Sequence, residues 1–518
     1  MRQASLVILN GVVWAPGRPP ATAVAVEGEL IISVGTDADV RSLIGAGTRV
    51  IDARGGTILP AFNDAHVHFL IASRSLNELD LFGAETQAEV ERRIHLYADT
   101  SHSAWLTGRG WFYAAFPGGM PSIELLDQLV PDRPAYLESF DAHTAWVNSR
   151  ARDISGLGPG PGVLKEAAML DVMRNLPART AEMDIAALKA GMRVAASHGI
   201  ASVQEAGDGL DQVPYYEVLR GRDQLTMRVR LAFDMVPGLD AGEWARRLSD
   251  YQEVSRSRNT DPWISTGILK AFADGVIESR TAAMLERYQG STECGAPLWS
   301  TDELAHSVRA ADARGWQVQV HAIGDAAIRS ALDAFAECGA GRRHRVEHIE
   351  APAAADIARF AQLGVIASMQ PQHAEPVKNL LEIWAPNLGP ERAARGWPWA
   401  SILGAGARLA FGTDWPVVPL DPMASLHVAV NRQTLRGDPP GGWLPNERLS
   451  LADAIAAWTS GAAYAEHMEQ RKGRLEVGML ADIAVLDRDL RTTPSSEIVS
   501  IKVEATAVGG RLVYEARE

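Results

Sequence analysis

The sequence predicts an α/β protein, namely a (β/α)8 TIM barrel with a small composite β-sandwich formed by both termini. Three observations predict this fold class. Apolar segments of four to six residues alternate with Ala-rich helical segments such as 302–314, 326–337 and 353–363, which favours parallel βαβ units. Eight core strands can be proposed, and eight fits a closed barrel better than an open sheet. The two chain ends, in contrast, contain short strands separated by glycine-containing turns.

The candidate strands at the chain ends lie far apart in the sequence. They span 5–9, 12–14, 23–26 and 30–34 near the N-terminus, and 483–486, 501–508 and 512–514 near the C-terminus. Two β-rich ends that flank an α/β middle suggest one small domain built from both termini. We therefore expect residues 1–58 and 471–518 to form the sandwich.

The middle of the chain contains the expected barrel, residues 59–470. Its eight candidate strands span 62–68, 202–206, 229–234, 268–273, 317–321, 345–349, 365–369 and 408–413. The interval between the first two is too long for one βα unit. We therefore expect an insertion at about 70–195, in which the segment GLGPGPG (156–162) forms a loop because it is rich in glycine and proline.

Length and composition limit the function classes. At roughly 150 residues per domain, 518 residues suggest three or four domains, and the strand pattern reduces this to two. A chain with 47% hydrophobic residues can fold around a large core, and 50 basic against 64 acidic residues disfavour binding to nucleic acid or anionic membranes. Two cysteines, no targeting pattern and no long apolar run indicate a cytoplasmic protein.

Polar side chains end several of the predicted strands. The first ends in DAHVH, where His66 and His68 point to the same side because they are two residues apart. The complete set is His66, His68, Lys270, His321, His348 and Asp414. Any one of these histidines alone is more often structural, and a lysine in a strand usually extends to solvent. Joint placement at one barrel mouth predicts a divalent metal site, with zinc favoured and manganese, iron or cobalt as alternatives.

The motifs around these residues resemble the amidohydrolase superfamily, and more narrowly amidohydrolase family 3, the YtcJ-like branch. They are DAHVH, ILKAFADG, VQVHAIGD, RVEHIE and FGTDWP, together with VLKEAAM, ESRTAAML, ASMQPQHA and ADIAVLD. The similarity covers almost the whole chain. It implies a barrel with a composite β-sandwich, as the strand pattern does, and a metal-dependent hydrolase activity.

The resemblance also implies a role for each ligand residue. His66, His68 and Asp414 would hold one metal ion, and His321 and His348 would hold a second. Lys270 stands where the family has a carboxylated lysine that bridges two ions, and one or two ions are expected because family members vary in occupancy. Asp414 would then accept a proton from a metal-bound water and pass it to the leaving group.

Six further residues are weaker candidates for substrate contacts. They are Trp111, Glu166, Arg280, Gln370, His373 and Trp415. The alternative for Glu166 is a helix-face carboxylate, for Arg280 a pair with Glu278, and for His373 a structural hydrogen bond. Several tryptophans lie in loops expected at the barrel mouth, so we expect an aromatic or apolar substrate group as one option.

The leading functional hypothesis is hydrolysis of a C–N bond other than a peptide bond, in an amide, N-acyl or carbamate group of a small molecule. Ester or lactone hydrolysis at the same site is the close alternative. A catalytically silent homologue with a binding or regulatory role would be expected to lack ligands, and none is missing. A lyase or isomerase would need a separate acid or base. The oligomeric state is left open, and self-association, with a homodimer as one option, is suggested only by analogy with other barrel enzymes.

Overall fold

The computed structural model describes residues 3–258, 261–339 and 341–516. Its centre is an eight-stranded sheet in the order β19-β18-β17-β16-β15-β14-β13-β7, and every neighbouring pair is parallel. The strands are β7 (Phe62–Val67), β13 (Ile200–Glu205), β14 (Arg228–Asp234), β15 (Ile264–Phe272), β16 (Gln317–Ala322), β17 (Arg345–His348), β18 (Ile366–Met369) and β19 (Leu409–Phe411). All eight overlap the strands predicted from the sequence.

Polar and close-packed residues connect the first strand to the last. The carboxylate of Asp64, in β7, accepts hydrogen bonds from the backbone N–H of Thr413 at 3.0 Å and from its hydroxyl at 2.6 Å. A side chain at Gly412 would lie 2.4 Å from the backbone nitrogen of His66, so only glycine permits this approach. The sheet therefore curls into a barrel, which confirms the predicted fold class.

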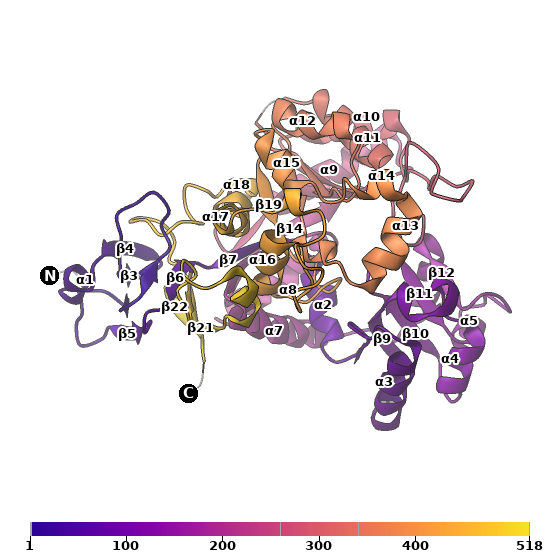
Figure 1. Cartoon of the computed structure of the whole chain (residues 1–518), viewed down its shortest axis with the longest axis horizontal. Helices are drawn as coiled ribbons and strands as arrows, with labels where there is room; N and C mark the ends of the chain where they lie inside the picture. The colour runs from indigo at the N-terminus through magenta and orange to yellow at the C-terminus, as the bar shows by residue number, and fades with distance from the viewer. Residues whose placement is uncertain (1–2, 259–260, 340, 517–518) are drawn as a thin grey trace.

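Helices follow the strands and cover the outside of the barrel (Figure 1). They include α7 (Ala181–Ser197), α8 (Gly209–Gly221), α9 (Ala241–Ser255), α10 (Thr301–Asp312), α11 (Asp325–Ala336) and α12 (Ala354–Leu363). In α11, Ile328, Leu332 and Phe335 are buried at the i, i+4, i+7 spacing of one helix face. The side chain of Ser300 caps the start of α10 by accepting a hydrogen bond from the backbone of Glu303.

The two chain ends form the sandwich. One sheet has the order β4-β3-β1-β5 and the other has the order β2-β6-β20-β21-β22. Their strands are β1 (Leu6–Leu9), β2 (Val12–Val13), β3 (Ala23–Glu27), β4 (Leu30–Gly35), β5 (Arg49–Asp52), β6 (Thr57–Pro60), β20 (Ile483–Leu486), β21 (Val503–Val508) and β22 (Arg511–Glu515). Leu6 and Ile8 from one sheet share a buried core with Ile483 and Val485 from the other. Figure 1 shows both termini on this side of the molecule.

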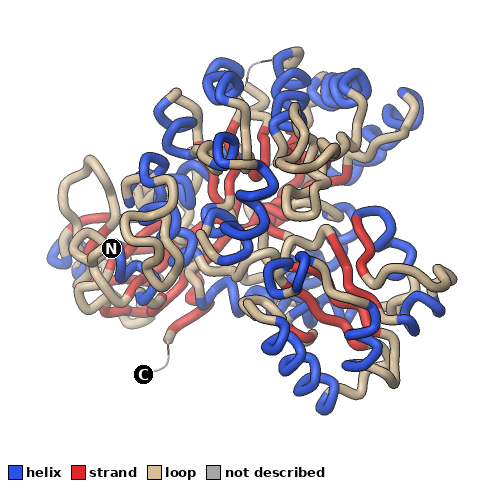
Figure 2. The backbone as a smooth tube through the Cα atoms, turned by 45° about the vertical axis from the view of Figure 1, so that its right-hand side comes forward, coloured by secondary structure: helices blue, strands red, loops and turns tan. Residues whose placement is uncertain are grey.

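The insertion is a folded α/β unit (Figure 2). Its sheet has the order β12-β11-β10-β9-β8, made of β8 (Leu79–Asp80), β9 (Leu106–Trp111), β10 (Ala135–Ser139), β11 (Thr144–Val147) and β12 (Val163–Lys165). Helices α3 (Gln87–Thr100) and α4 (Ile123–Leu129) contribute to its separate core. Helix α7, at the end of the insertion predicted at about 70–195, packs on α2 (Phe69–Ser75) and on barrel strand β13.

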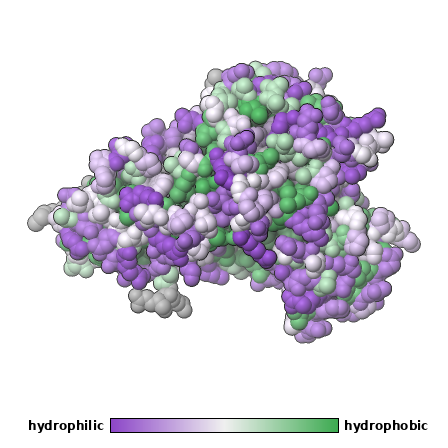
Figure 3. All heavy atoms as spheres, in the orientation of Figure 1, coloured by the Kyte–Doolittle hydropathy of each residue, from purple (hydrophilic) through white to green (hydrophobic). Residues whose placement is uncertain are grey.

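The surface gives two further observations. Figure 3 shows hydrophilic side chains over much of the visible face, with hydrophobic ones gathered toward its middle. Within the described ranges, no helix combines the length and apolar character needed to cross a membrane.

Candidate active site

All six predicted ligand residues come together at the carboxyl ends of the strands. Ligand atoms of His66, His348 and Asp414 lie within 4.8 Å of one another. Oδ1 of Asp414 lies 3.5 Å from Nε2 of His68, and the ring of His321 lies 4.5 Å from that of His348. Nζ of Lys270 is 3.4 Å from Nε2 of His66. Five barrel strands or their continuations thus contribute side chains to one cluster.

The backbone at two of these ligands is strained. His348 has a φ of 73°, Ile349 a φ of 54° and Asp414 a φ of 62°, in the left-handed region that side chains other than glycine rarely adopt. Such conformations persist where the surroundings fix them and are frequent at functional sites. The backbone N–H of Asp414 donates to the carbonyl of His66 at 2.7 Å, which ties the two ligands to each other.

A buried ion pair supports the first histidine. Nδ1 of His66 lies 2.6 Å from Oε2 of Glu347, and Nε of Arg345 donates to Oε1 of Glu347 at 2.9 Å. All three side chains are fully buried. This contact fixes the imidazole so that its Nε2 faces Lys270 and Asp414. Sequence reasoning missed Glu347, although the Arg-x-Glu alternation within RVEHIE is the signal that could have revealed it.

The electrostatics of the cluster fit a divalent cation. Burial lowers the pKa of His66, His321 and His348 well below its ordinary value and lowers that of His68 to about 3, so these imidazoles are neutral, as metal ligands must be. Nδ1 of His348 and Oδ1 of Asp414 are buried without a hydrogen-bond partner. Buried polar atoms rarely remain unpaired, so this donor set fits a metal ion.

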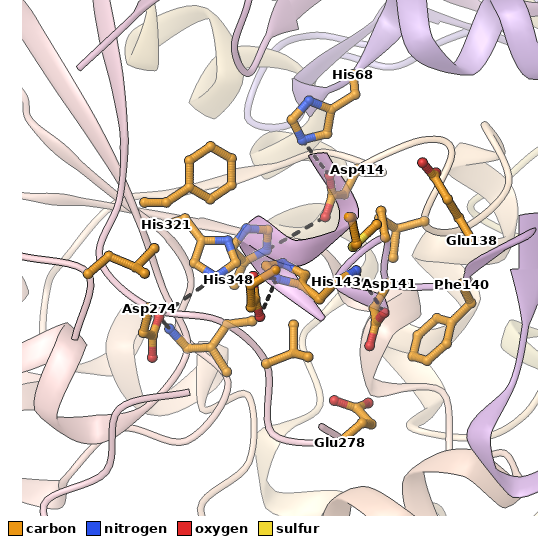
Figure 4. A pocket seen from close by; sticks show the side chains of 18 of the residues that line it. His68, Glu138, Phe140, Asp141, His143, Asp274, Glu278, His321, His348 and Asp414 are labelled. Carbon is orange, nitrogen blue, oxygen red and sulfur yellow. Dashed lines mark hydrogen bonds and ion pairs between the residues drawn. The ribbon is translucent and has the colours of Figure 1, made fainter. Parts of the chain in front are cut away.

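A cavity of about 470 Å³ opens onto the cluster (Figure 4). His68, His321, His348 and Asp414 line one part of it. An apolar wall is formed by residues of the insertion and of the loop after β14, namely Met169, Leu170, Met173, Met235 and Val236. A further part carries the carboxylates of Asp141, Glu278 and Glu350. The cavity is therefore of the size and mixed polarity of a small-molecule site.

Two of the six predicted substrate contacts line this cavity, Glu166 and His373. Nε2 of His373 lies 3.8 Å from Oδ2 of Asp414 and is itself without a hydrogen-bond partner. Glu166 pairs with His143, whose Nδ1 lies 3.0 Å from its Oε2. Both residues are thus placed where a bound molecule can reach them.

The other four predicted contacts are not among the residues that line this cavity. Trp111 is fully buried in the core of the insertion, where its indole N–H donates to the carbonyl of Leu137. Arg280 donates to Asn387, Gln370 is fully buried and Trp415 faces a neighbouring hollow. Of the tryptophans expected at the mouth, Trp397 lines the cavity. The apolar wall therefore consists mainly of methionine and aliphatic side chains.

His143 and Asp141 are functional candidates that sequence reasoning missed. They lie in the turn between β10 and β11 of the insertion, and both line the cavity. Burial alone would lower the pKa of His143, but the hydrogen bond and charge of Glu166 raise it to about 9. No strand-end pattern marks this turn, and only the fold brings it over the barrel.

Comparisons with known proteins agree with this geometry. The model of the amidohydrolase family matches residues 49–514. The chain is 29% identical to the protein LONG AFTER FAR-RED 3 of Arabidopsis thaliana, over 99% of this chain and 92% of that protein. It is 25% identical to an N-substituted formamide deformylase of Arthrobacter pascens, over 96% and 95% of the two chains.

A solved structure shares the fold. The crystal structure of an uncharacterized metal-dependent hydrolase from Pyrococcus furiosus superposes with a TM-score of 0.72 and 27% sequence identity, covering 93% of this chain and 99% of the other. The family match spans most of the chain, in agreement with the resemblance found in the sequence motifs. This protein therefore belongs to the amidohydrolase family.

Proposed function

We propose that this protein is a metal-dependent hydrolase that cleaves a C–N bond of a small molecule, in an amide, N-acyl or carbamate group. The observation that carries the proposal is the set of convergent, buried and unpartnered ligand atoms on His348 and Asp414 beside His66, open to a cavity. A structural metal site is normally closed by its protein ligands, whereas a catalytic site leaves a position open.

The division of the ligand residues between two ions is the one that the family resemblance of the sequence motifs implies. We assign His66, His68 and Asp414 to one ion and His321 and His348 to a second, with zinc favoured by the four imidazoles. We also propose that Lys270 is carboxylated between them, because a cationic ammonium 3.4 Å from His66 would repel a cation there. The neutral amine would add to CO2 and release one proton, giving an anionic carbamate.

The chain's own residues would perform the proton transfers. A bound divalent ion lowers the pKa of a water molecule and polarises a carbonyl. Asp414 is placed to accept the proton of the attacking water and to return it to the leaving nitrogen, since its Oδ1 lacks a hydrogen-bond partner. His143, held by Glu166 through Nδ1, is placed to donate from its other ring nitrogen to an oxygen that gains negative charge.

Two observations favour C–N cleavage over ester cleavage. The relative from Arthrobacter pascens is named for removing formyl groups from N-substituted formamides and matches this chain over 96% of its length. An amide also needs a proton donor for its poor leaving group, and Asp414 can serve after it has accepted the proton of water. The apolar wall with Met169, Met173 and Met235 would hold the rest of a small substrate.

The test combines metal analysis with a matched substrate panel. The protein purified from cells is analysed for bound metals, and the zinc-loaded protein is assayed on N-formyl and N-acetyl amines, carbamates, and esters of the same chain length. We expect bound zinc and faster turnover of the N-acyl compounds. Faster turnover of the esters would favour the ester hydrolase instead, and no turnover by the metal-loaded protein would favour a binding or regulatory role.

A further inference from the structure

Three carboxylates meet at one side of the cavity, and we call Asp141, Glu278 and Glu350 the acidic recess. They come from the turn between β10 and β11 of the insertion, from the loop after β15 and from the segment after β17. All three line the same cavity as His348 and Asp414. Figure 4 shows the side chains of Asp141 and Glu278 on one side of the cavity, away from His68.

Asp141 holds one oxygen ready for a ligand. Its Oδ1 accepts hydrogen bonds from the hydroxyl of Tyr113 at 3.2 Å, the hydroxyl of Ser139 at 2.5 Å and the backbone N–H of His143 at 3.1 Å. Its Oδ2 is buried and has no hydrogen-bond partner. The residue is only 7% exposed, and it lines the cavity. Three donors on one oxygen fix the carboxylate in place and leave the other oxygen unsatisfied.

The carboxylates of the recess repel one another, and a bound cation would favour their ionised forms. Glu350 accepts from the indole N–H of Trp384 at 2.7 Å, and Glu278 accepts from the amide of Asn379 at 3.3 Å. These partners are neutral. The charge of His143 lowers the pKa of Asp141 and of Glu278, but this imidazole is already paired with Glu166 through Nδ1. Burial, with repulsion from Glu350 and Asp141, raises the pKa of Glu278 well above its ordinary value.

We propose that the acidic recess binds a positively charged group of the substrate, so that this protein acts on small amides that carry an ammonium or guanidinium group. An ammonium group offers three donors to surrounding acceptors, which suits the free Oδ2 of Asp141 and its two neighbours. This inference deepens the proposed function and rests on it for the claim that the ligand is a substrate.

The first experiment measures binding and needs no turnover. The affinities of hexylammonium, hexanol and hexanoate for the purified full-length protein are measured by calorimetry. We expect hexylammonium to bind at least about tenfold more tightly than hexanol, because hydrogen bonds between charged groups in a buried site are stronger than those of a neutral hydroxyl. We expect hexanoate not to bind detectably. Equal affinities for hexylammonium and hexanol would overturn the proposal.

Variants locate the binding group. Asp141→Asn keeps the oxygen that accepts three hydrogen bonds and removes the group that can carry the negative charge. Glu278→Gln keeps the oxygen that accepts from Asn379 and likewise removes an ionisable carboxyl. Either change should reduce the preference for hexylammonium several-fold, while Glu391→Gln should not, since that side chain is 92% exposed and is not among the residues that line the cavity. A preference that survives in both cavity variants would exclude the recess, and having two variants guards against the loss of one to misfolding.

Two outcomes separate this inference from the proposed function. If N-formyl hexylamine is hydrolysed as fast as mono-N-formyl-hexanediamine, C–N cleavage stands and the recess proposal fails. If no amide is cleaved but hexylammonium binding depends on Asp141, the recess stands as a cation site and the proposed reaction fails. Displacement of hexylammonium by millimolar Mg²⁺ alone would overturn the proposal in favour of an inorganic cation site.

Discussion

Both ends of the barrel bury charged side chains, but the two ends differ in whether these groups have partners within the protein. At the amino ends of the strands, Arg228 forms a two-bond ion pair with Asp482 of the sandwich, at 2.8 and 3.0 Å. Nearby, Lys472 pairs with Glu466 at 2.7 Å. At the carboxyl ends, His348 and Asp414 bury polar atoms that have no hydrogen-bond partner.

This contrast separates stability from function. An unsatisfied buried polar group costs about 1–3 kcal/mol, so the carboxyl end gives up folding free energy where it leaves these atoms unpaired. The amino end satisfies the charges of these pairs within the protein and joins the barrel to the sandwich. Barrel enzymes generally place chemistry at the carboxyl ends of the strands and stabilising contacts at the amino ends. Substitutions at the carboxyl end should therefore lower activity and leave stability unchanged, whereas substitutions at the amino end should lower stability and leave activity unchanged.

The largest effect is expected for Asp414→Asn. The amide cannot accept the proton of water, so we expect kcat to fall about 10³-fold, within the range for loss of a general base. The apparent Tm of the metal-free protein should not fall, because the change removes a charge that is buried beside Asp64. Steady-state kinetics and thermal unfolding measure the two quantities.

A fold defect would produce a different result. If Asp414→Asn lowers both kcat and the apparent Tm, the residue is structural and the contrast between the barrel ends fails at its most important position. The matched control is Asp482→Asn, an equally conservative change at the amino end. For Asp482→Asn we expect the stability to fall and the activity to remain unchanged.

The barrel and the convergence of the candidate ligand residues could be predicted because they depend on patterns that repeat along the chain. His66, His321 and His348 each follow an apolar strand, and parallel strands in a barrel bring such positions to one mouth. Most strands of the sandwich follow from similarly local signals, but β5 (Arg49–Asp52) and β6 (Thr57–Pro60) were not among the predicted strands. The spacing of these residues in a single sequence is therefore enough to predict which side chains lie at the barrel mouth.

The walls of the cavity could not be predicted in this way. Asp141 and His143 lie in a turn of the insertion, and their position depends on how a separate unit packs against the barrel. Trp111 illustrates the converse: it looked like a mouth residue, but the insertion has its own core, which buries it. Aromatic side chains predict burial more reliably than they predict which core will bury them.

The next largest effect is expected for Asp482→Asn at the amino end. This change leaves Arg228 buried beside a neutral partner, and breaking a buried ion pair costs about 3–5 kcal/mol. We expect a lower urea midpoint and an unchanged kcat at 25 °C. Glu476→Gln is the comparison, since its pair with Arg18 is exposed and such pairs contribute about 0–1 kcal/mol. Equal losses in the two variants would show that burial does not determine the effect.

A smaller effect is expected for Glu347→Gln, which tests the link between the buried ion pair and the ligands. Glutamine can still bond to His66, but it lacks the charge that strengthens this imidazole as a ligand. We expect zinc affinity to fall about 10–100-fold, the usual range for a residue that supports a metal ligand. Competition with a zinc chelator measures it. Unchanged affinity would show that the Glu347 charge does not tune the site.

The smallest effect concerns acid stability at the amino end. Burial alone would raise the pKa of Asp482, but the charge and hydrogen bonds of Arg228 outweigh it, so its pKa is below the ordinary 3.8. A carboxyl whose pKa is lowered by folding stabilises the protein above its unfolded pKa, and this contribution is lost as the pH falls through the folded value. The urea midpoints of wild type and Asp482→Asn should therefore differ most at pH 5 and converge as the pH falls below about 3.8. A constant difference over that range would show that the pair stabilises the protein through packing and not through charge, and the amino end would then resemble an ordinary apolar interface.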